Sequence, residues 1–582
     1  MKDERDFEGP EANSSASGSR REGTSERHGN LLGRTTLVSG LTFVSRILGF
    51  VREALSAAIF GATSPIFDAF LTAWRVPNLF RRFLGEGALS TSLVSRLTEV
   101  DEDEGEDAGA ALFLGTLRLA AGTLSVLCVL VMSVAYFLPS FVSPAGLEAI
   151  LGKDPGPVLE LTIRVSPFVI LICLSALVSG ALNVRGHFLM PSVGPVLLNV
   201  AWILSLVIIG INYGSASPDL LSGAGAGTLS TSEYARHMAM TRVLAWGVLV
   251  AGFFQLICQV GPLRSFGFLG AKKVTRAAGG PTPRQVLLTA APLALGAAVY
   301  QINVMVDGLM AEWLPDGGPT SHYYANRIQQ FPLALIAIAA MNSVFPRLKE
   351  LGHRSDLNGL RRVLDKTQLG VAFLALPASC GLFLLANPMA KLVFEHGAFD
   401  AAGTARVASA LSMLALALLP AGAVLLATRA YYALDDYRTP VLVSCSMLVT
   451  NIGLNVLFLF VFGMDVEGLA LGTAISTWGN LILLVPGLSR RLRGAESLGA
   501  VVWGRRLGAM VFGSLVAGAL AYGAHAGTLA GLGGALSPTL GGALALAAAL
   551  ITGAGSYFTI STVLGIPEVA VLRARLRRKR AT

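Results

Sequence analysis

Long apolar stretches without a charged residue constrain this chain more than any other feature. Residues 121–136 and 539–563 contain no Asp, Glu, Lys or Arg. A helix needs about 20 mostly apolar residues to cross the hydrocarbon core of a bilayer. Only 14% of the whole chain is charged, whereas a soluble domain carries about 25% charged residues. The sequence therefore predicts an all-α polytopic membrane protein and excludes an ordinary soluble enzyme.

About fourteen segments are long and apolar enough to be transmembrane helices. Each of them is bounded by polar, Gly-rich or charged residues that are typical of connections. The expected spans are 36–60, 66–94, 109–138, 158–184, 191–212, 239–261, 285–312, 322–346, 364–389, 403–434, 439–462, 466–488, 504–525 and 539–564.

Basic residues gather in alternate connections between these spans. They cluster at 264–284, 347–366 and 490–506 and in the C-terminal segment 573–580, whereas connections such as 61–65 and 313–321 contain no Lys or Arg. Basic connections stay in the cytoplasm. We therefore expect an even number of spans with both termini cytoplasmic, and a basic C-terminal tail that favours anionic membrane lipids. Acidic residues influence orientation little, so the acidic segment 97–108 does not overturn this assignment.

Short matches suggest an internal repeat. Residues 73–76 (AWRV) resemble 325–328 (ANRI), and Leu198-Asn199-Val200 resembles Leu454-Asn455-Val456. Matches separated by roughly 250 residues fit a transporter built from two parallel six-helix repeats around a central cavity. The expected organisation is a disordered cytoplasmic tail (1–33), an N-lobe with six spans (34–262), a C-lobe with six spans (263–490), and two C-terminal helices with the basic tail (491–582).

Ionisable residues inside the first two spans are the strongest functional signal. Charges within a membrane are costly and tend to face a cavity. Asp68, Arg75 and Arg82 follow one another at intervals of seven residues, which places them on one helix face. Glu86 extends this face, and Arg81 is adjacent to it.

The same reasoning applies to arginines outside the second span. Arg46 and Arg52 lie in the first span, and Arg327 lies at the repeat position in the second half. A cavity rich in arginine predicts an anionic ligand, because the guanidinium donates two parallel hydrogen bonds to a phosphate. The alternative is that these arginines pair with Glu53, Asp68 and Glu86, or extend to the membrane interface.

Several sequence strings resemble the MurJ (MviN) family, the lipid II flippases of the MOP exporter superfamily. They are SRILGFVREALSAAIFGAT (45–63), DAFLTAWRVPNLFRRFLGEGALSTSLV (68–94) and YYANRIQQFPLALIAIAAMNSVFPRL (323–348). The resemblance implies two lobes in a V, a groove for a polyprenyl tail beside the last two helices, alternating access and a location in the cell inner membrane. It assigns substrate contacts to Arg46, Arg52, Arg82, Arg327 and Asp68, with Arg75 at a position where some members have Lys.

The resemblance also points to a candidate sodium site and to two departures. Asp307 is an isolated carboxylate in the seventh span, and Asn451, Asn455 and Thr473 could add oxygen ligands. For these three neutral residues, hydrogen bonding between helices is the alternative. Asn326 and Gln330 stand where some members carry acids, which puts in doubt any role assigned to those acids.

The function predicted from these features is a flippase that moves the diphosphate-sugar head group of lipid II to the periplasmic leaflet for cell wall synthesis. We expect no catalytic residue and no cofactor beyond sodium coupling and the membrane potential. The expected partners are lipid II, membrane lipids and cell-wall synthesis proteins, and not nucleic acid. Three alternatives remain open: a flippase for another polyprenyl-diphosphate oligosaccharide, an ion-coupled exporter of small molecules, and a scaffold that transports nothing.

Overall fold

The fold follows from helices that bury apolar side chains against one another in two lobes. The computed structural model describes residues 18–82, 88–215, 230–270, 281–532, 536–570 and 573, which contain helices and no β-strand. Ten of the described helices are long and apolar enough to cross a membrane, or eleven if one bent pair counts as a single span. The chain is thus an all-α multi-pass membrane protein, and fourteen spans stays a prediction.

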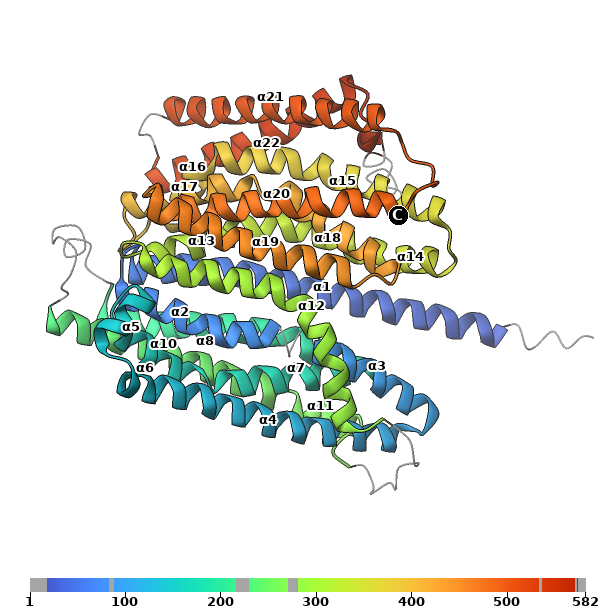
Figure 1. Cartoon of the computed structure of the whole chain (residues 1–582), viewed down its shortest axis with the longest axis horizontal. Helices are drawn as coiled ribbons and strands as arrows, with labels where there is room; N and C mark the ends of the chain where they lie inside the picture. Colours follow the sequence, from blue (N-terminus) through green and yellow to red (C-terminus); the bar gives the residue numbers. More distant parts are fainter. Residues whose placement is uncertain are drawn as a thin grey trace, which may run out of the picture.

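The first half of the chain forms one lobe, drawn from blue to green in Figure 1. Most of its helices run side by side along the length of the molecule. Its elements are α1 (Gly18–Phe60), α2 (Pro65–Phe80), α3 (Ala88–Asp103), α4 (Glu106–Phe141), α5 (Pro144–Leu151), α6 (Pro155–Val165), α7 (Phe168–Val184), α8 (Leu189–Tyr213), α10 (Thr231–Ile257) and α11 (Val260–Ser265).

The second half forms the other lobe, and the last two helices lie at its outer edge (Figure 1). The elements of this lobe are α12 (Pro283–Met310), η2 (Ala311–Trp313), α13 (Gly318–Leu333), η3 (Ala334–Ile338), α14 (Ala339–His353), α15 (Leu357–Leu384), α16 (Ala386–Phe394), α17 (Ala401–Ala415), α18 (Leu418–Ala433), α19 (Arg438–Val456), η4 (Leu457–Val461) and α20 (Val466–Arg491). The outer pair is α21 (Ala500–Leu532) and α22 (Pro538–Val563).

Interrupted helices occur at matching places in the two halves and support the internal repeat. In the second expected span of the first half, α2 continues into a π-helical turn at residues 81–82, and the counterpart of this span passes from α13 through the π-helical η3 into α14. The fourth is divided into α6 and α7, and its counterpart into α17 and α18, which meet at 44°. Pro167 and Pro420 lie at these two breaks, where a proline cannot donate the helical hydrogen bond.

The start of α1 differs from the predicted disordered tail. The helix begins at Gly18, so residues 18–33 are helical, and only residues 1–17 of the predicted tail lie outside the described part of the chain. Extending a helix that already exists requires no new nucleation step. A polar segment can therefore continue a membrane helix even though its composition is typical of disorder.

The two lobes meet closely at one end of the molecule. We call it the neutral end, because it carries the connections 61–65 and 313–321; the basic end carries 264–270 and 347–356. At the neutral end the backbone N–H of Ala398 donates to the Ala58 carbonyl at 2.9 Å. Gly317 and Gly397 have φ of +87° and +60°, and a Cβ on either would collide with the α1 end. Glycine is therefore required at both contacts.

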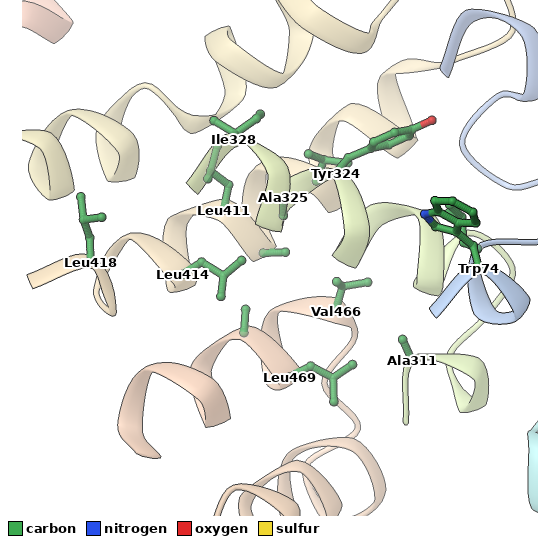
Figure 2. Close-up of a cluster of buried hydrophobic side chains, with 14 of the residues drawn as sticks. Trp74, Ala311, Tyr324, Ala325, Ile328, Leu411, Leu414, Leu418, Val466 and Leu469 are labelled. Carbon is green, nitrogen blue, oxygen red and sulfur yellow. The ribbon is translucent and has the colours of Figure 1, made fainter. Parts of the chain in front are cut away.

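A continuous apolar core joins the lobes near this closed end. Trp74 of α2 belongs to the same buried cluster as Tyr324 and Ala325 of α13, and Figure 2 shows these side chains together with residues of α17 and α20. Buried apolar area contributes roughly 25 cal/mol per Å². Separation of the lobes at the neutral end would expose part of this cluster, so the closed contact is stabilised by packing as well as by polar bonds.

Candidate functional site

A cavity lies between the lobes on the side of the basic end. Its volume is about 740 Å³. Arg46 and Arg52 of α1 line it, as does Arg327 of α13. The lining includes Asn183 and Phe188, which flank the connection between α7 and α8; the intervening Arg185 donates to the carbonyl of Phe266, beside α11 at the basic end. The cavity thus extends toward the basic end.

Glu53 is the centre of the charged side of this cavity. It is 4% exposed and forms ion pairs with Arg52 and with Arg327 Nε, the latter at 2.9 Å. The hydroxyl of Tyr323 donates to the same carboxylate oxygen at 2.9 Å. Because Glu53 belongs to α1 and Arg327 to α13, this carboxylate bridges the two lobes. The alternative of internal pairing is thus confirmed for Arg52 and Arg327.

Unused donors remain beside Glu53 despite this pairing. Arg46 lines the cavity and forms no ion pair or hydrogen bond with any described residue. Arg52 donates to Asn199 Oδ1 at 3.1 Å and lies over the Trp202 ring at 4.6 Å. Its Nε, however, is buried and has no partner within the described part of the chain. Two arginines share one carboxylate, and a third arginine in the same cavity lining is unpaired within the described residues, so the site is net positive.

The remaining arginines of the predicted cluster separate into two groups. Arg81 lines the cavity and donates to Asn78 Oδ1 at 3.0 Å. Arg82 instead donates to Gln301 of α12 at 3.3 Å. Glu86 lies outside the described residues.

Asp68 lies in the closed contact rather than in the cavity lining. It is fully buried, and one oxygen accepts from the N–H and the hydroxyl of Thr320 at 3.0 and 2.6 Å. The other accepts from the N–H of Gly317 at 2.8 Å and from Lys153 Nζ at 3.0 Å. Asp68 thereby fastens α2 to the start of α13 at the neutral end.

The face shared by Asp68, Arg75 and Arg82 is confirmed, but its surroundings differ from the prediction. Arg75 donates to the Gly308 carbonyl of α12 at 2.5 Å, so all three side chains reach the second lobe. A Cβ at Gly308 would collide with the Arg75 guanidinium. The sequence placed this face along the cavity, whereas the structure uses it to hold the lobes together.

Two further charged residues complete the closed contact. Lys153 also pairs with Asp316 at 3.2 Å, and although burial lowers the pKa of Lys153, the neighbouring carboxylates raise it above its usual value. Glu312 accepts from Thr72, which also accepts from Arg75 at 2.8 Å.

Sequence reasoning missed Lys153, Glu312 and Tyr323 as parts of these clusters. Lys153 offered a signal, because it is a basic residue in the connection between α4 and α6, at the end where the connections 61–65 and 313–321 contain no Lys or Arg. Its pairing with Asp68 explains why a lysine lies there. Glu312 and Tyr323 are ordinary residues in their local sequence, and only the packing of the two lobes gives them partners.

A second buried carboxylate, Asp307, has only neutral hydrogen-bond partners. It is 3% exposed and accepts from Asn451, Asn455 and Thr473 at 2.6, 2.7 and 2.9 Å. The structure therefore brings together all four residues of the candidate sodium site, from α12, α19 and α20. Asn455 Oδ1 is buried and has no partner among the described residues.

Comparison with known proteins places these features in a family. The family model "Lipid II flippase MurJ" matches residues 56–538. A protein named "Probable lipid II flippase MurJ" from Rhizobium tropici is 30% identical over 563 residues, which cover 95% of this chain and 97% of the relative.

Two solved structures share the fold. A structure titled "Lipid II flippase MurJ, inward closed conformation" aligns with a TM-score of 0.66 at 21% identity, covering 91% of this chain and 98% of that one. An inward-facing multidrug transporter of the MATE family, in the MOP superfamily, aligns with a TM-score of 0.59 at 13% identity over 77% and 94% of the two chains. The chain therefore shares its overall fold with both of these solved transporters.

Proposed function

Because this chain belongs to the MurJ family, we propose that it carries the head group of lipid II across the membrane through the cavity between its lobes. The observation that carries the proposal is the Glu53 cluster. Arg52 and Arg327 share one carboxylate beside a cavity of about 740 Å³, and neither Arg46 nor Arg52 Nε has a hydrogen-bond partner among the described residues. A diphosphate offers several charged acceptor oxygens, which suit such an arrangement.

The orientation of the molecule follows from its charged connections. The basic end faces the cytoplasm of the cell inner membrane, with both termini on that side. The cavity then opens toward the leaflet where the substrate is made, and the closed neutral end faces the periplasm. The polyprenyl tail stays in lipid along α21 and α22, which lie at the outer edge of the second lobe (Figure 1).

Binding of the diphosphate competes with Glu53 for the same guanidinium groups. When the phosphate oxygens take the place of the carboxylate on Arg327, the bond between α1 and α13 is replaced by a bond through the substrate. Alternating access then requires the lobes to close at the basic end and to part at the neutral end. In this mechanism no covalent bond is broken, and the substrate crosses through a change of conformation alone. The membrane potential can contribute about 2.3 kcal/mol per charge per 100 mV.

A sodium ion fits the residues around Asp307. The carboxylate and Thr473 Oγ are hard oxygen donors, and rotation of the Asn451 and Asn455 amides, whose nitrogens face Asp307, would present two further oxygens. A bound cation would neutralise Asp307 and tie α12 to α19 and α20. We expect sodium, compared with potassium, to raise the melting temperature of the purified protein, and Asp307→Asn to remove that difference. An equal effect of both ions on the wild type would exclude the site.

The transport proposal is tested in cells depleted of their own flippase. Arg52→Ala and Arg327→Ala should each abolish the appearance of lipid II head groups at the outer leaflet, while the protein still inserts. Arg242→Ala is the matched control, because Arg242 is paired with Glu160 at 2.7 Å and does not line the cavity. Normal export by either cavity variant would overturn the proposal. Supplying another polyprenyl-diphosphate oligosaccharide in the same assay separates the closest alternative.

A further inference from the structure

The cavity has two chemically different sides, and the second is unused by the diphosphate. The charged lining residues come from α1, α13 and the end of α2. The lining contributed by α7, α8 and α10 contains hydroxyl, amide and apolar groups and no charged side chain within the described residues. A head group with an anionic part and a neutral polar part would match this division.

Three residues of α7 form a polar strip on the neutral side. Ser175, Ser179 and Asn183 all line the cavity and follow one another at intervals of four residues, so they share one helix face. The strip extends roughly 12 Å along the helix at 1.5 Å per residue. Because Asn183 lies next to the end of α7 at Val184, the strip runs from the inside of the cavity to its opening.

Gln259 holds the two serines in complementary orientations. This residue is 1% exposed, and its Nε2 donates to Ser175 Oγ at 2.7 Å while its Oε1 accepts from Ser179 Oγ at 3.0 Å. The Ser175 proton is therefore left free to donate, and the lone pairs of Ser179 are left free to accept. A fixed donor next to a fixed acceptor is suited to a ligand that carries both kinds of group.

Gln255 adds the observation that points to a ligand. It is 3% exposed and lines the cavity, yet its Nε2 is buried and has no hydrogen-bond partner in the described part of the chain. A buried donor without a partner has lost its hydrogen bonds to water without replacement, so such groups are rare and call for an explanation. The neighbouring Gln259 amide, by contrast, uses both its oxygen and its nitrogen in hydrogen bonds. Of these two glutamines, only the one that lines the cavity has an unbonded amide nitrogen.

We infer that Gln255, Ser175 and Ser179 form a carbohydrate subsite that binds the neutral sugar part of the head group while the arginines hold the diphosphate. This inference rests on the proposed function and refines it. Sugar hydroxyl and acetamido groups donate and accept hydrogen bonds, and a rotation of the Gln255 side chain toward the cavity would let them satisfy its buried Nε2. A site built to bond such groups rejects a ligand that lacks them, so the subsite makes the cavity selective for a glycosylated lipid.

The test compares the binding of two probes to the purified full-length protein in lipid nanodiscs. The probes are lipid II and a polyprenyl diphosphate without sugars. Gln255→Met keeps the size of the side chain and removes the amide, so it should weaken lipid II binding about tenfold and leave the sugar-free probe unchanged. Ser175→Ala should act in the same direction, and Arg52→Ala should weaken both probes.

Thermal stability separates a ligand-binding role from a structural one. Because the amide of Gln255 is unsatisfied in the protein, Gln255→Met should leave the melting temperature unchanged or raise it. An equal loss of both probes, unchanged lipid II binding in both neutral variants, or a lower melting temperature of Gln255→Met with weakened binding would overturn the subsite. Failure of the wild type to bind either probe would instead overturn the proposed function itself.

Discussion

Two charged clusters built from neighbouring helices differ in how completely their bonds are satisfied. At the neutral end, both oxygens of Asp68 are bonded by groups of the protein: Gly317, Thr320 and Lys153. In the cavity, by contrast, Glu53 pairs with Arg52 and Arg327, while Arg46 in the same lining has no bonding partner among the described residues. A buried cluster whose hydrogen bonds are all satisfied holds the two lobes together. A cluster with unpaired donors next to a cavity can bind a ligand. Charge within the membrane therefore does not by itself identify a substrate site.

Replacement of Asp68, whose carboxylate is fully hydrogen-bonded, should have the largest effect on conformation. Asp68→Ala leaves Lys153 and the Thr320 and Gly317 donors without their acceptor, and breaking a buried ion pair costs about 3–5 kcal/mol. The population open at the neutral end should rise about a hundredfold or more. Distances between spin labels at Thr231 and Ala402, exposed residues of the two lobes at this end, measure the change. An unchanged distance distribution would contradict the role of Asp68 in the closed contact.

Loss of the lysine partner should have a smaller effect of the same sign. Lys153→Met keeps the apolar stem and removes a charged hydrogen bond worth about 1.5–3 kcal/mol, while the three other donors to Asp68 remain. The same spin-label pair should show partial opening. Lys391→Met is the control, since Lys391 is exposed and paired with Glu395 within one helix, and it should change nothing.

Replacement of Glu53 should change the affinity for the substrate and leave the closed contact at the neutral end unchanged. Glu53→Gln frees Arg52 and Arg327 from their internal competitor, so a polyprenyl diphosphate should bind about tenfold tighter and transport should slow because release is impaired. Titration of the purified protein gives the affinity. Weaker binding would show that Glu53 positions the arginines for the substrate rather than competing with it.

Helix periodicity predicted which charged residues share a face but not what that face would contact. The spacing of Asp68, Arg75 and Arg82 fixes their relative directions, and all three do reach the second lobe. Their absolute direction depends on how the helix rotates within the lobe, which is decided by packing of residues such as Trp74 against the core. The sequence therefore could not distinguish the cavity wall from the closed contact.

The long-range group around Asp307 was recoverable because a family pattern identified it, whereas the pairing of Arg327 with Glu53 was an alternative drawn from the charged residues themselves. Asp307 and Thr473 are separated by 166 residues, and the resemblance to MurJ proteins grouped them with Asn451 and Asn455 before the geometry did. Glu53 lies next to Arg52 in sequence, a spacing that does not predict a shared helix face. Whether Gln255 Nε2 finds a hydrogen-bond partner depends on all the residues packed around it. The local sequence therefore does not predict that this atom lacks one among the described residues.

The arginine cluster around Glu53 is proposed to move a lipid-linked diphosphate across the bilayer. The most direct measurement uses purified protein in sealed vesicles that contain lipid II in both leaflets, with a membrane-impermeant reagent that modifies exposed head groups. The wild type should make nearly all head groups reactive over time, while a variant with both Arg52→Ala and Arg327→Ala should expose only those of the outer leaflet. Equal exposure by the two proteins, or a wild type that leaves the inner head groups protected, would contradict the account.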